Sequence, residues 1–209
     1  MKIQNYKANA GFGVIFPAKT FIYEGEQDVY IVSPGPVEEQ CKNEIVSLNK
    51  NIHIIAPNNF HHMHIKKAKE SFPLANFYGP KRAQTMSEVE LINTSELPDR
   101  DLKSIKILGH KTLGETCFYI DKIKTLIITD LVFNMHHKMN LASKLTFMLV
   151  GCFHKLGMSK LIKRTIDDND VFRESLQGLL KFPFEQVLIN HGDSLSRDEF
   201  VQFIEEELK

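Results

Sequence analysis

The feature that most constrains this chain is a series of short, β-rich apolar runs, each followed by a histidine or an aspartate. The runs and the polar residues that follow them are 52–56 with His61 and His62, 105–109 with His110, 126–129 with Asp130, and 187–190 with His191. Proteins with α/β sheets bind their ligands beyond the carboxyl ends of strands. We therefore expect these four segments to meet at one edge of a sheet.

Composition favours a single soluble domain. A length of 209 residues and a hydrophobic content of 43% allow one sizeable core, so we expect one domain over 1–209. Lysine plus arginine and aspartate plus glutamate balance at 26 each, which gives no electrostatic reason to expect a nucleic acid as partner.

Cysteine usage and the apolar segments bear on the cellular location. The three cysteines are far apart and form no Cys-x-x-Cys pair, which argues against a disulfide scaffold and a cysteine-rich zinc site. The N-terminus lacks the apolar core of a signal peptide, and no segment reaches the roughly 18 apolar residues of a membrane-spanning helix. We therefore expect a cytoplasmic protein.

The periodicity of apolar residues predicts that strands and helices alternate along most of the chain. The expected strands lie within 11–33 and at 52–56, 76–78, 104–109, 115–120, 126–129 and 187–190. The expected helices lie at 37–48, at 61–70, within 134–181, and after the capping-box sequence from Ser196 to Glu199. Short connections between the strands from 104 to 129 favour antiparallel pairing. Mixed sheets with helices on their outer faces fit this order best.

Histidines and an aspartate in this pattern point to a divalent metal, zinc or iron. Such ions bind imidazole nitrogens and carboxylates, and they need an open position if the site is to do chemistry. The predicted metal ligands are His61, His62, His110, Asp130 and His191. A single histidine is more often a surface or core residue than a metal ligand. Several such residues that each follow a predicted strand favour a metal site instead.

The remaining histidines leave alternatives open. His64 lies three residues after His61, so on a helix the two side chains share a face and could bind a metal by themselves. A metal site made by His61 and His64 would lack a third ligand nearby in the sequence. His136 and His137 follow Asp130 and could reach the same cavity, although we interpret them as loop residues beside a substrate entrance.

The order of these segments resembles the metallo-β-lactamase fold over almost the whole chain. The family's Gly-His-Thr-x-Gly element resembles residues 109–114, its Gly-Asp strand end resembles Thr129-Asp130, and its last strand closes on a histidine as here at His191. The resemblance implies an α/β (α+β) fold, a four-layer αββα sandwich of two mixed β-sheets with outer helices. The pattern is similar to a divergent branch of unknown function.

One family motif is strongly altered. When the family loop His-x-His-x-Asp-His is aligned on His62, His61 replaces the aspartate, Asn59 replaces the second histidine and Pro57 replaces the first. The resemblance then implies that the family's first metal position keeps only His110 and the amide oxygen of Asn59. The second position keeps enough ligands for one metal, namely His61 as a substitute, His62, His191 and Asp130. The family's Asp-x-Gly turn, which supports the metal loop, is also replaced at 32–35.

The predicted function follows from this ligand set. We expect a metal-dependent hydrolase in which one metal activates a water against an ester, thioester, lactone or phosphodiester in a small-molecule substrate. Asp130 would hold the metal and orient the water, and His110 would donate a proton or a hydrogen bond to the developing oxyanion. The alternative is a catalytically degenerate protein that binds no metal and acts as a binding or scaffold module.

A basic and apolar helical insertion is predicted at about 134–181. Its run 145–153 is almost entirely apolar, and no acidic residue occurs between Asp130 and Asp167. The basic residues there are Lys138, Lys144, Lys155, Lys160, Lys163 and Arg164. Over 138–164 this segment could cover the active site or dock on an anionic membrane surface. Alternatively, its apolar residues pack on the sheet or on a second subunit.

Overall fold

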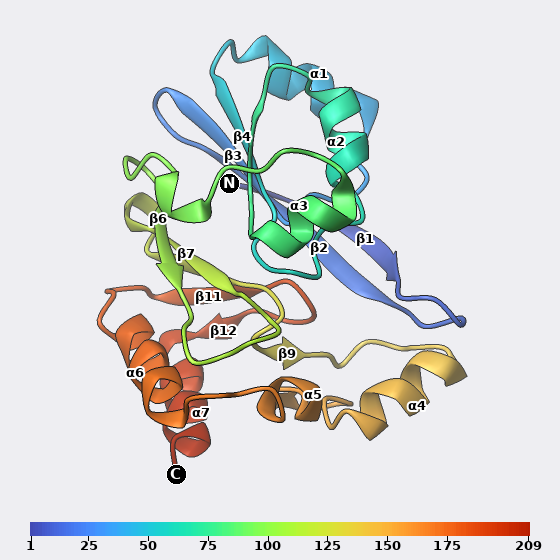
Figure 1. Cartoon of the computed structure of the whole chain (residues 1–209), viewed down its shortest axis with the longest axis vertical. Coiled ribbons are helices and arrows are strands. Elements are labelled where there is room, and N and C mark those ends of the chain that lie inside the picture. The colour runs from blue at the N-terminus through green and yellow to red at the C-terminus, as the bar shows by residue number, and fades with distance from the viewer.

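The computed structural model describes residues 1–209 and contains two five-stranded sheets that pack face to face (Figure 1). The first sheet has the order β1 (Lys2–Asn9), β2 (Ile15–Glu24), β3 (Asp28–Val32), β4 (Asn51–Ile55) and β5 (Asn76–Tyr78). The second has the order β12 (Leu195–Ser196), β11 (Gln186–Ile189), β8 (Thr125–Ile128), β7 (Thr116–Ile120) and β6 (Lys103–Lys106). β3, β4 and β5 run parallel, as do β8 and β11, and the other pairs are antiparallel. Both sheets are therefore mixed, as predicted.

The central strands are buried on both faces, which explains their nearly continuous apolar sequences. In β3, Tyr30 and Val32 belong to the core between the two sheets, whereas Val29 and Ile31 belong to the core under the helices. Successive side chains of a strand point to opposite faces, so one strand can serve two cores. The core between the sheets also holds Phe118 and Ile127 from the second sheet.

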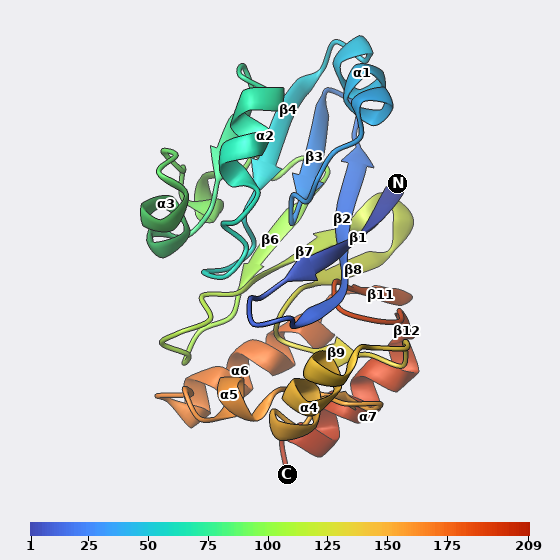
Figure 2. The ribbon, with the colours of Figure 1, turned by 90° about the vertical axis from the view of Figure 1, so that its right-hand side faces the viewer.

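Helices cover the outer face of each sheet, and together with the sheets they form four layers (Figure 2). On the first sheet these are α1 (Glu39–Ser47), α2 (Ile65–Ser71) and α3 (Lys81–Ser87), and on the second α6 (Asn169–Leu180) and α7 (Arg197–Glu207). Two short 3-10 helices, η1 (Thr94–Glu96) and η2 (Asp121–Ile123), lie in connections. The predicted αββα sandwich is confirmed. None of the helices has the length and apolar character needed to cross a bilayer.

The segment between β8 and α6 forms a cap at one end of the sandwich (Figure 1). It contains β9 (Phe133–Asn134), α4 (Leu141–Leu149), β10 (Leu156–Gly157) and α5 (Lys160–Lys163). The helical signal predicted over 134–181 is thus interrupted by a small antiparallel pair, β9 with β10. The cap has its own small core of Met135, Phe147 and Cys152. α6, by contrast, packs on the second sheet through Phe172 and Leu176.

Two elements differ from the sequence prediction. Strand β1 was not expected, because its alternation of polar residues gives little apolar signal, and most of its side chains are exposed or half-buried. Helix α2 begins at Ile65 rather than near residue 61, because residues 59–64 form turns. His61 and His64 therefore do not share a helix face. The predicted capping box of α7 is present, with the Ser196 N–H donating to Glu199.

Candidate metal centre

Strand ends from both sheets bring three candidate ligands together. β8 and β11 are parallel neighbours in which Ile128 pairs with Ile189, so Asp130 and His191 emerge side by side at the same edge. His61 follows β4 of the other sheet. Asp130 and His191 are buried and His61 is half-buried. The convergence predicted from the strand ends is thus found for these three residues.

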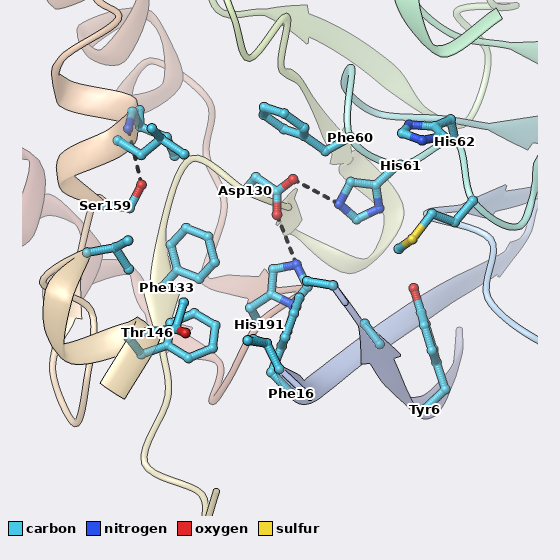
Figure 3. Close-up of a pocket in the computed structure, with 18 of the residues that line it drawn as sticks. Tyr6, Phe16, Phe60, His61, His62, Asp130, Phe133, Thr146, Ser159 and His191 are labelled. Carbon is cyan, nitrogen blue, oxygen red and sulfur yellow. Dashed lines mark hydrogen bonds and ion pairs between the residues drawn. The ribbon is translucent and has the colours of Figure 1, made fainter. Parts of the chain in front are cut away.

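The three side chains face one another across short distances (Figure 3). Nε2 of His61 lies 3.2 Å from Oδ2 of Asp130, and Nε2 of His191 lies 2.9 Å from Oδ1 of Asp130. One ligand atom from each residue lies within 4.8 Å of the other two. Two imidazoles and one carboxylate form a donor set that suits zinc or iron and leaves positions open for water and substrate.

The ring of His191 is held in one orientation. Its Nδ1 lies 3.0 Å from the carbonyl oxygen of Pro17, and because a carbonyl only accepts, Nδ1 must carry the proton. Phe133 stacks on the ring at 5.4 Å between centroids, and Phe16 meets it edge-on at 5.0 Å. With Nδ1 bound to Pro17, Nε2 is the ring nitrogen that faces Asp130 and that could bind a metal ion.

His61 is held from behind by Ser33. The Oγ of Ser33 lies 2.8 Å from Nδ1 of His61 and accepts a hydrogen bond of 2.8 Å from Nδ2 of Asn190. Ser33 is fully buried and has a φ of 57°, a left-handed conformation that is costly for a residue with a Cβ. Ser33 thus supplies a contact from the 32–35 turn to the loop that carries His61. Sequence reasoning missed this role, since a serine before Pro-Gly reads only as a turn.

A buried polar network fixes Asp130. Nδ2 of Asn58 donates to Oδ2 of Asp130 at 2.9 Å and to Oε2 of Glu115 at 2.8 Å. Oε1 of Glu115 accepts the Thr129 backbone N–H at 2.7 Å. Neither Asn58 nor Glu115 was identified from the sequence. A glutamate at the start of an apolar strand gives no signal that it will be buried beside a second carboxylate.

The electrostatics of the site favour a cation. Burial alone would raise the pKa of Asp130, but His61 and His191 outweigh it and hold that pKa well below its usual range. Burial, with the charge of Asp130 added, raises the pKa of Glu115 to about 7. Burial lowers the pKa of His61, yet Asp130 outweighs this and the net direction is upward. The ionised carboxylate of Asp130 thus places a negative charge where the two imidazoles meet.

An apolar pocket of about 400 Å³ opens from these residues. Twelve of its twenty lining residues are hydrophobic, so the pocket is suited to an apolar group. Tyr6 is one of the polar residues of the lining, and its hydroxyl lies on the same side of the pocket as His61 (Figure 3). Burial raises the pKa of Tyr6 to about 12, so the hydroxyl stays a hydrogen-bond donor at neutral pH. A Cβ at Gly35 would clash with the Tyr6 ring, which explains the glycine there.

Comparison with known proteins identifies the architecture. No protein-family model and no curated protein matches the sequence. Among solved structures, TMB-1 is 12% identical, with a TM-score of 0.62 over 99% of this chain and 94% of its own. FIM-1 from Pseudomonas aeruginosa in the mono-zinc form is 11% identical, with a TM-score of 0.60 over 99% and 91%. A metallo-β-lactamase from Pontibacter korlensis is 12% identical, with a TM-score of 0.59 over 99% and 93%. The chain has the metallo-β-lactamase fold.

Within the metallo-β-lactamase fold, two of the five predicted ligands lie outside the group. Nδ1 of His62 lies 3.2 Å from the carbonyl oxygen of Asn59, and the ring sits beyond His61 as seen from Asp130 (Figure 3). Both nitrogens of His110 are engaged with the backbone. Its Nδ1 accepts the Leu113 N–H at 3.0 Å, and its Nε2 lies 2.9 Å from the Ile162 carbonyl oxygen, to which it donates. In this arrangement His110 has no nitrogen free to bind a metal or to serve an oxyanion.

The other residues aligned with the family's first metal position also bond to the backbone. Nδ2 of Asn59 donates to the carbonyl oxygen of Thr112 at 2.8 Å, and the carbonyl of Pro57 accepts the Thr116 N–H. These contacts, like those of His110, hold the loops of the metallo-β-lactamase fold together. The structure contains one group of potential ligands, made of His61, Asp130 and His191.

Proposed function

We propose that the chain is a metal-dependent hydrolase in which His61, Asp130 and His191 bind a single divalent cation, zinc or iron. The observation that carries the proposal is the convergence of these side chains within 4.8 Å at an apolar pocket. The donor set fits such a cation, because each histidine has its Nδ1 engaged elsewhere and directs Nε2 at the carboxylate. That one structural neighbour is a mono-zinc form agrees with a single metal.

A bound divalent cation lowers the pKa of a water molecule towards about 7 and polarises the oxygen of the group to be cleaved. The chain's own residues would supply orientation. The lowered pKa of Asp130 makes it a hydrogen-bond acceptor that positions water rather than a group that stores a proton. Tyr6, protonated at neutral pH, would donate a hydrogen bond to the oxyanion that develops on the substrate.

The pocket limits the substrate class. Phe16, Phe133 and Phe147 line it together with Val150 and Leu161, so a fully polar substrate would leave these groups without partners. The substrate would therefore join an apolar portion to an ester, thioester, lactone or phosphodiester. The cleavable group would lie beside Asp130, between His61 and His191 (Figure 3).

The deciding experiment measures the metal content of protein purified without chelators. We expect about one zinc or iron per chain in the native protein, since the three side chains form a single site. His61→Ala and His191→Ala should each lose the metal. His62→Ala is the matched control, because it removes a neighbouring imidazole that lies outside the ligand group, and it should keep the metal.

Activity is then tested on a panel of apolar p-nitrophenyl esters, acyl thioesters, lactones and bis-p-nitrophenyl phosphate. Hydrolysis that requires metal and is lost in Asp130→Asn supports the proposal. A native protein without metal or hydrolysis would contradict it and would favour the alternative, a binding or scaffold module built on this fold.

A further inference from the structure

The outer face of helix α4 is apolar. The inner face buries Ser143 and Phe147, whereas the outer face exposes Leu141, Leu145, Met148 and Leu149, the first at 71% and the last at 78%. At 3.6 residues per turn, the four exposed side chains span an arc of about 100°. A helix on the surface of a soluble protein normally carries polar residues there.

The exposed apolar surface continues onto neighbouring elements. The β1–β2 turn carries Phe12, which is fully exposed, and this turn is attached to α4. Nδ2 of Asn140 donates to the carbonyl of Gly13 at 2.9 Å, and Ser143 Oγ donates to the carbonyl of Ile15 at 2.6 Å. In Figure 1 the turn lies beside the start of α4. Leu161 on α5 adds a further exposed leucine. We call this surface the α4 platform, and its residues are Phe12, Leu141, Leu145, Met148, Leu149 and Leu161.

The platform belongs to the one strongly basic part of the chain. Five exposed cations of this segment take part in no ion pair, and they are Lys138, Lys144, Lys155, Lys160 and Arg164. No acidic residue occurs from 131 to 166 that could neutralise them. An exposed apolar helix face within a segment rich in unpaired cations is the pattern of a helix that lies in the surface of an anionic bilayer.

The platform and the pocket share their elements. Thr146, Phe147 and Val150, from the inner side of α4 and its end, line the pocket, and so do Leu161 and Ile162 of α5. A helix is about 10 Å across, so a surface touching the outer face of α4 would lie one helix away from the pocket. Molecules dissolved in that surface would need only a short path to the candidate metal site.

We propose that the α4 platform docks on an anionic lipid bilayer. If the proposed function holds, the substrate is then an acyl-bearing amphiphile that enters the pocket from that surface. A second copy of the chain fits the α4 platform less well than an anionic bilayer does. In a two-fold dimer the same patch meets itself, so the five unpaired cations of each copy would face those of the other and repel.

The test is co-sedimentation with vesicles of phosphatidylcholine alone and of phosphatidylcholine with phosphatidylglycerol. We expect binding to the anionic vesicles, weakened by added salt, and little binding to the neutral ones. The double variant Leu145→Glu/Leu149→Glu should reduce binding by about tenfold or more. Leu74→Glu is the matched control, because Leu74 is 97% exposed and precedes β5, at the sheet end opposite the candidate site. It should bind like the native chain.

A second variant, Lys138→Glu/Lys144→Glu, tests the charges and keeps the experiment informative if the leucine variant folds poorly. This variant should also bind the anionic vesicles more weakly than the native protein. Absence of binding in the native protein, or binding that both double variants retain, overturns the proposal. The proposal is also overturned if the native protein binds no vesicles but forms a dimer in sedimentation velocity, and if Leu145→Glu/Leu149→Glu abolishes that dimer. Vesicle binding by His191→Ala separates the two proposals, since docking should survive there even if metal and hydrolysis are lost.

Discussion

Ser33 Oγ lies 2.8 Å from Nδ1 of His61, and this contact joins the end of β3 to the loop after β4. The hydroxyl is fully buried, and its backbone adopts a left-handed conformation that a serine rarely takes. A costly backbone conformation that places one hydroxyl against a candidate ligand indicates that Ser33 positions His61.

Replacing Ser33 should therefore weaken metal binding. In Ser33→Ala the Cβ and the backbone conformation are kept, so the loss of the hydroxyl is the main change. We expect metal affinity to fall by about 10- to 100-fold, as for other groups that orient a ligand. Titration against a chelator measures this. Ser47→Ala removes an exposed hydroxyl bonded to the Glu44 carbonyl and should leave affinity unchanged. Equal metal affinities for Ser33→Ala and Ser47→Ala would show that Ser33 does not position His61.

Replacing His110 should affect stability rather than metal content. His110→Ala removes one hydrogen bond within the 109–114 loop and one to Ile162 at α5. The free energy of unfolding should fall by about 1–3 kcal/mol, and amides of α5 should exchange faster. Urea unfolding and hydrogen exchange measure these effects, with the exposed His137→Ala as control. A loss of metal with stability intact would instead make His110 a ligand, as the sequence suggested.

Replacing Tyr6 should slow hydrolysis without releasing the metal. Tyr6→Phe keeps the ring in place over Gly35 and removes only the donor. If the hydroxyl stabilises the oxyanion, kcat should fall by about 100-fold or more, while KM and metal content stay close to native. Steady-state kinetics on the best ester substrate measures the effect. Tyr119→Phe, which removes a hydroxyl bonded to Asp121 outside the pocket, should leave kcat unchanged.

A buried pair remote from the metal site should make stability depend on pH. Asp28 is 2% exposed and accepts hydrogen bonds from His53 Nε2 and Asn51 Nδ2, each at 3.0 Å. Burial raises the pKa of Asp28, but these partners and Arg100 outweigh it and the net direction is downward. The folded pKa therefore lies below the unfolded one. The resulting stability is present above about pH 4 and is lost as the pH falls through the folded pKa.

Asp28→Asn tests this dependence. It should lower the free energy of unfolding by about 1–3 kcal/mol near neutral pH, since the hydrogen bonds lose their charged acceptor. Towards about pH 3 the difference in free energy of unfolding between native and variant proteins should shrink, because protonation of the native carboxyl increases as the pH falls towards its folded pKa. Urea unfolding at both pH values measures the difference. The exposed pair of Lys66 and Glu88 provides the control, and Glu88→Gln should change little at either pH.

Apolar periodicity predicted mixed sheets with outer helices because it reflects which residues are buried, whereas the four-layer order was implied by the resemblance to the metallo-β-lactamase fold. The strands buried on both faces and the capping box at Ser196 were found where expected. Strand β1 was missed because its sequence is largely polar, and the start of α2 because turns occupy residues 59–64. These errors arose where pairing with other parts of the chain, rather than local sequence, decides the structure.

For the site, Asp130 and His191 could be predicted because each closes an apolar run, two residues after the end of a strand. His61 and His62 could not be told apart, since only the folded turn decides which ring faces Asp130. His110 matched a family motif, but its partner Ile162 lies 52 residues later. Ser33 and Asn58 act through contacts 28 and 72 residues apart in the chain, which no local pattern reveals.

The candidate ligands come from both halves of the sandwich, with His61 from the first sheet and Asp130 and His191 from the second. A single cation held by all three would add a link between two layers that hydrogen bonds from Asn58, Asn190 and His191 already join there. Occupancy would then stabilise the folded chain in proportion to its affinity and the metal concentration. The metal supply of the cell would thereby control how long the protein survives proteolysis, so that starved cells would lose the protein itself as well as its activity.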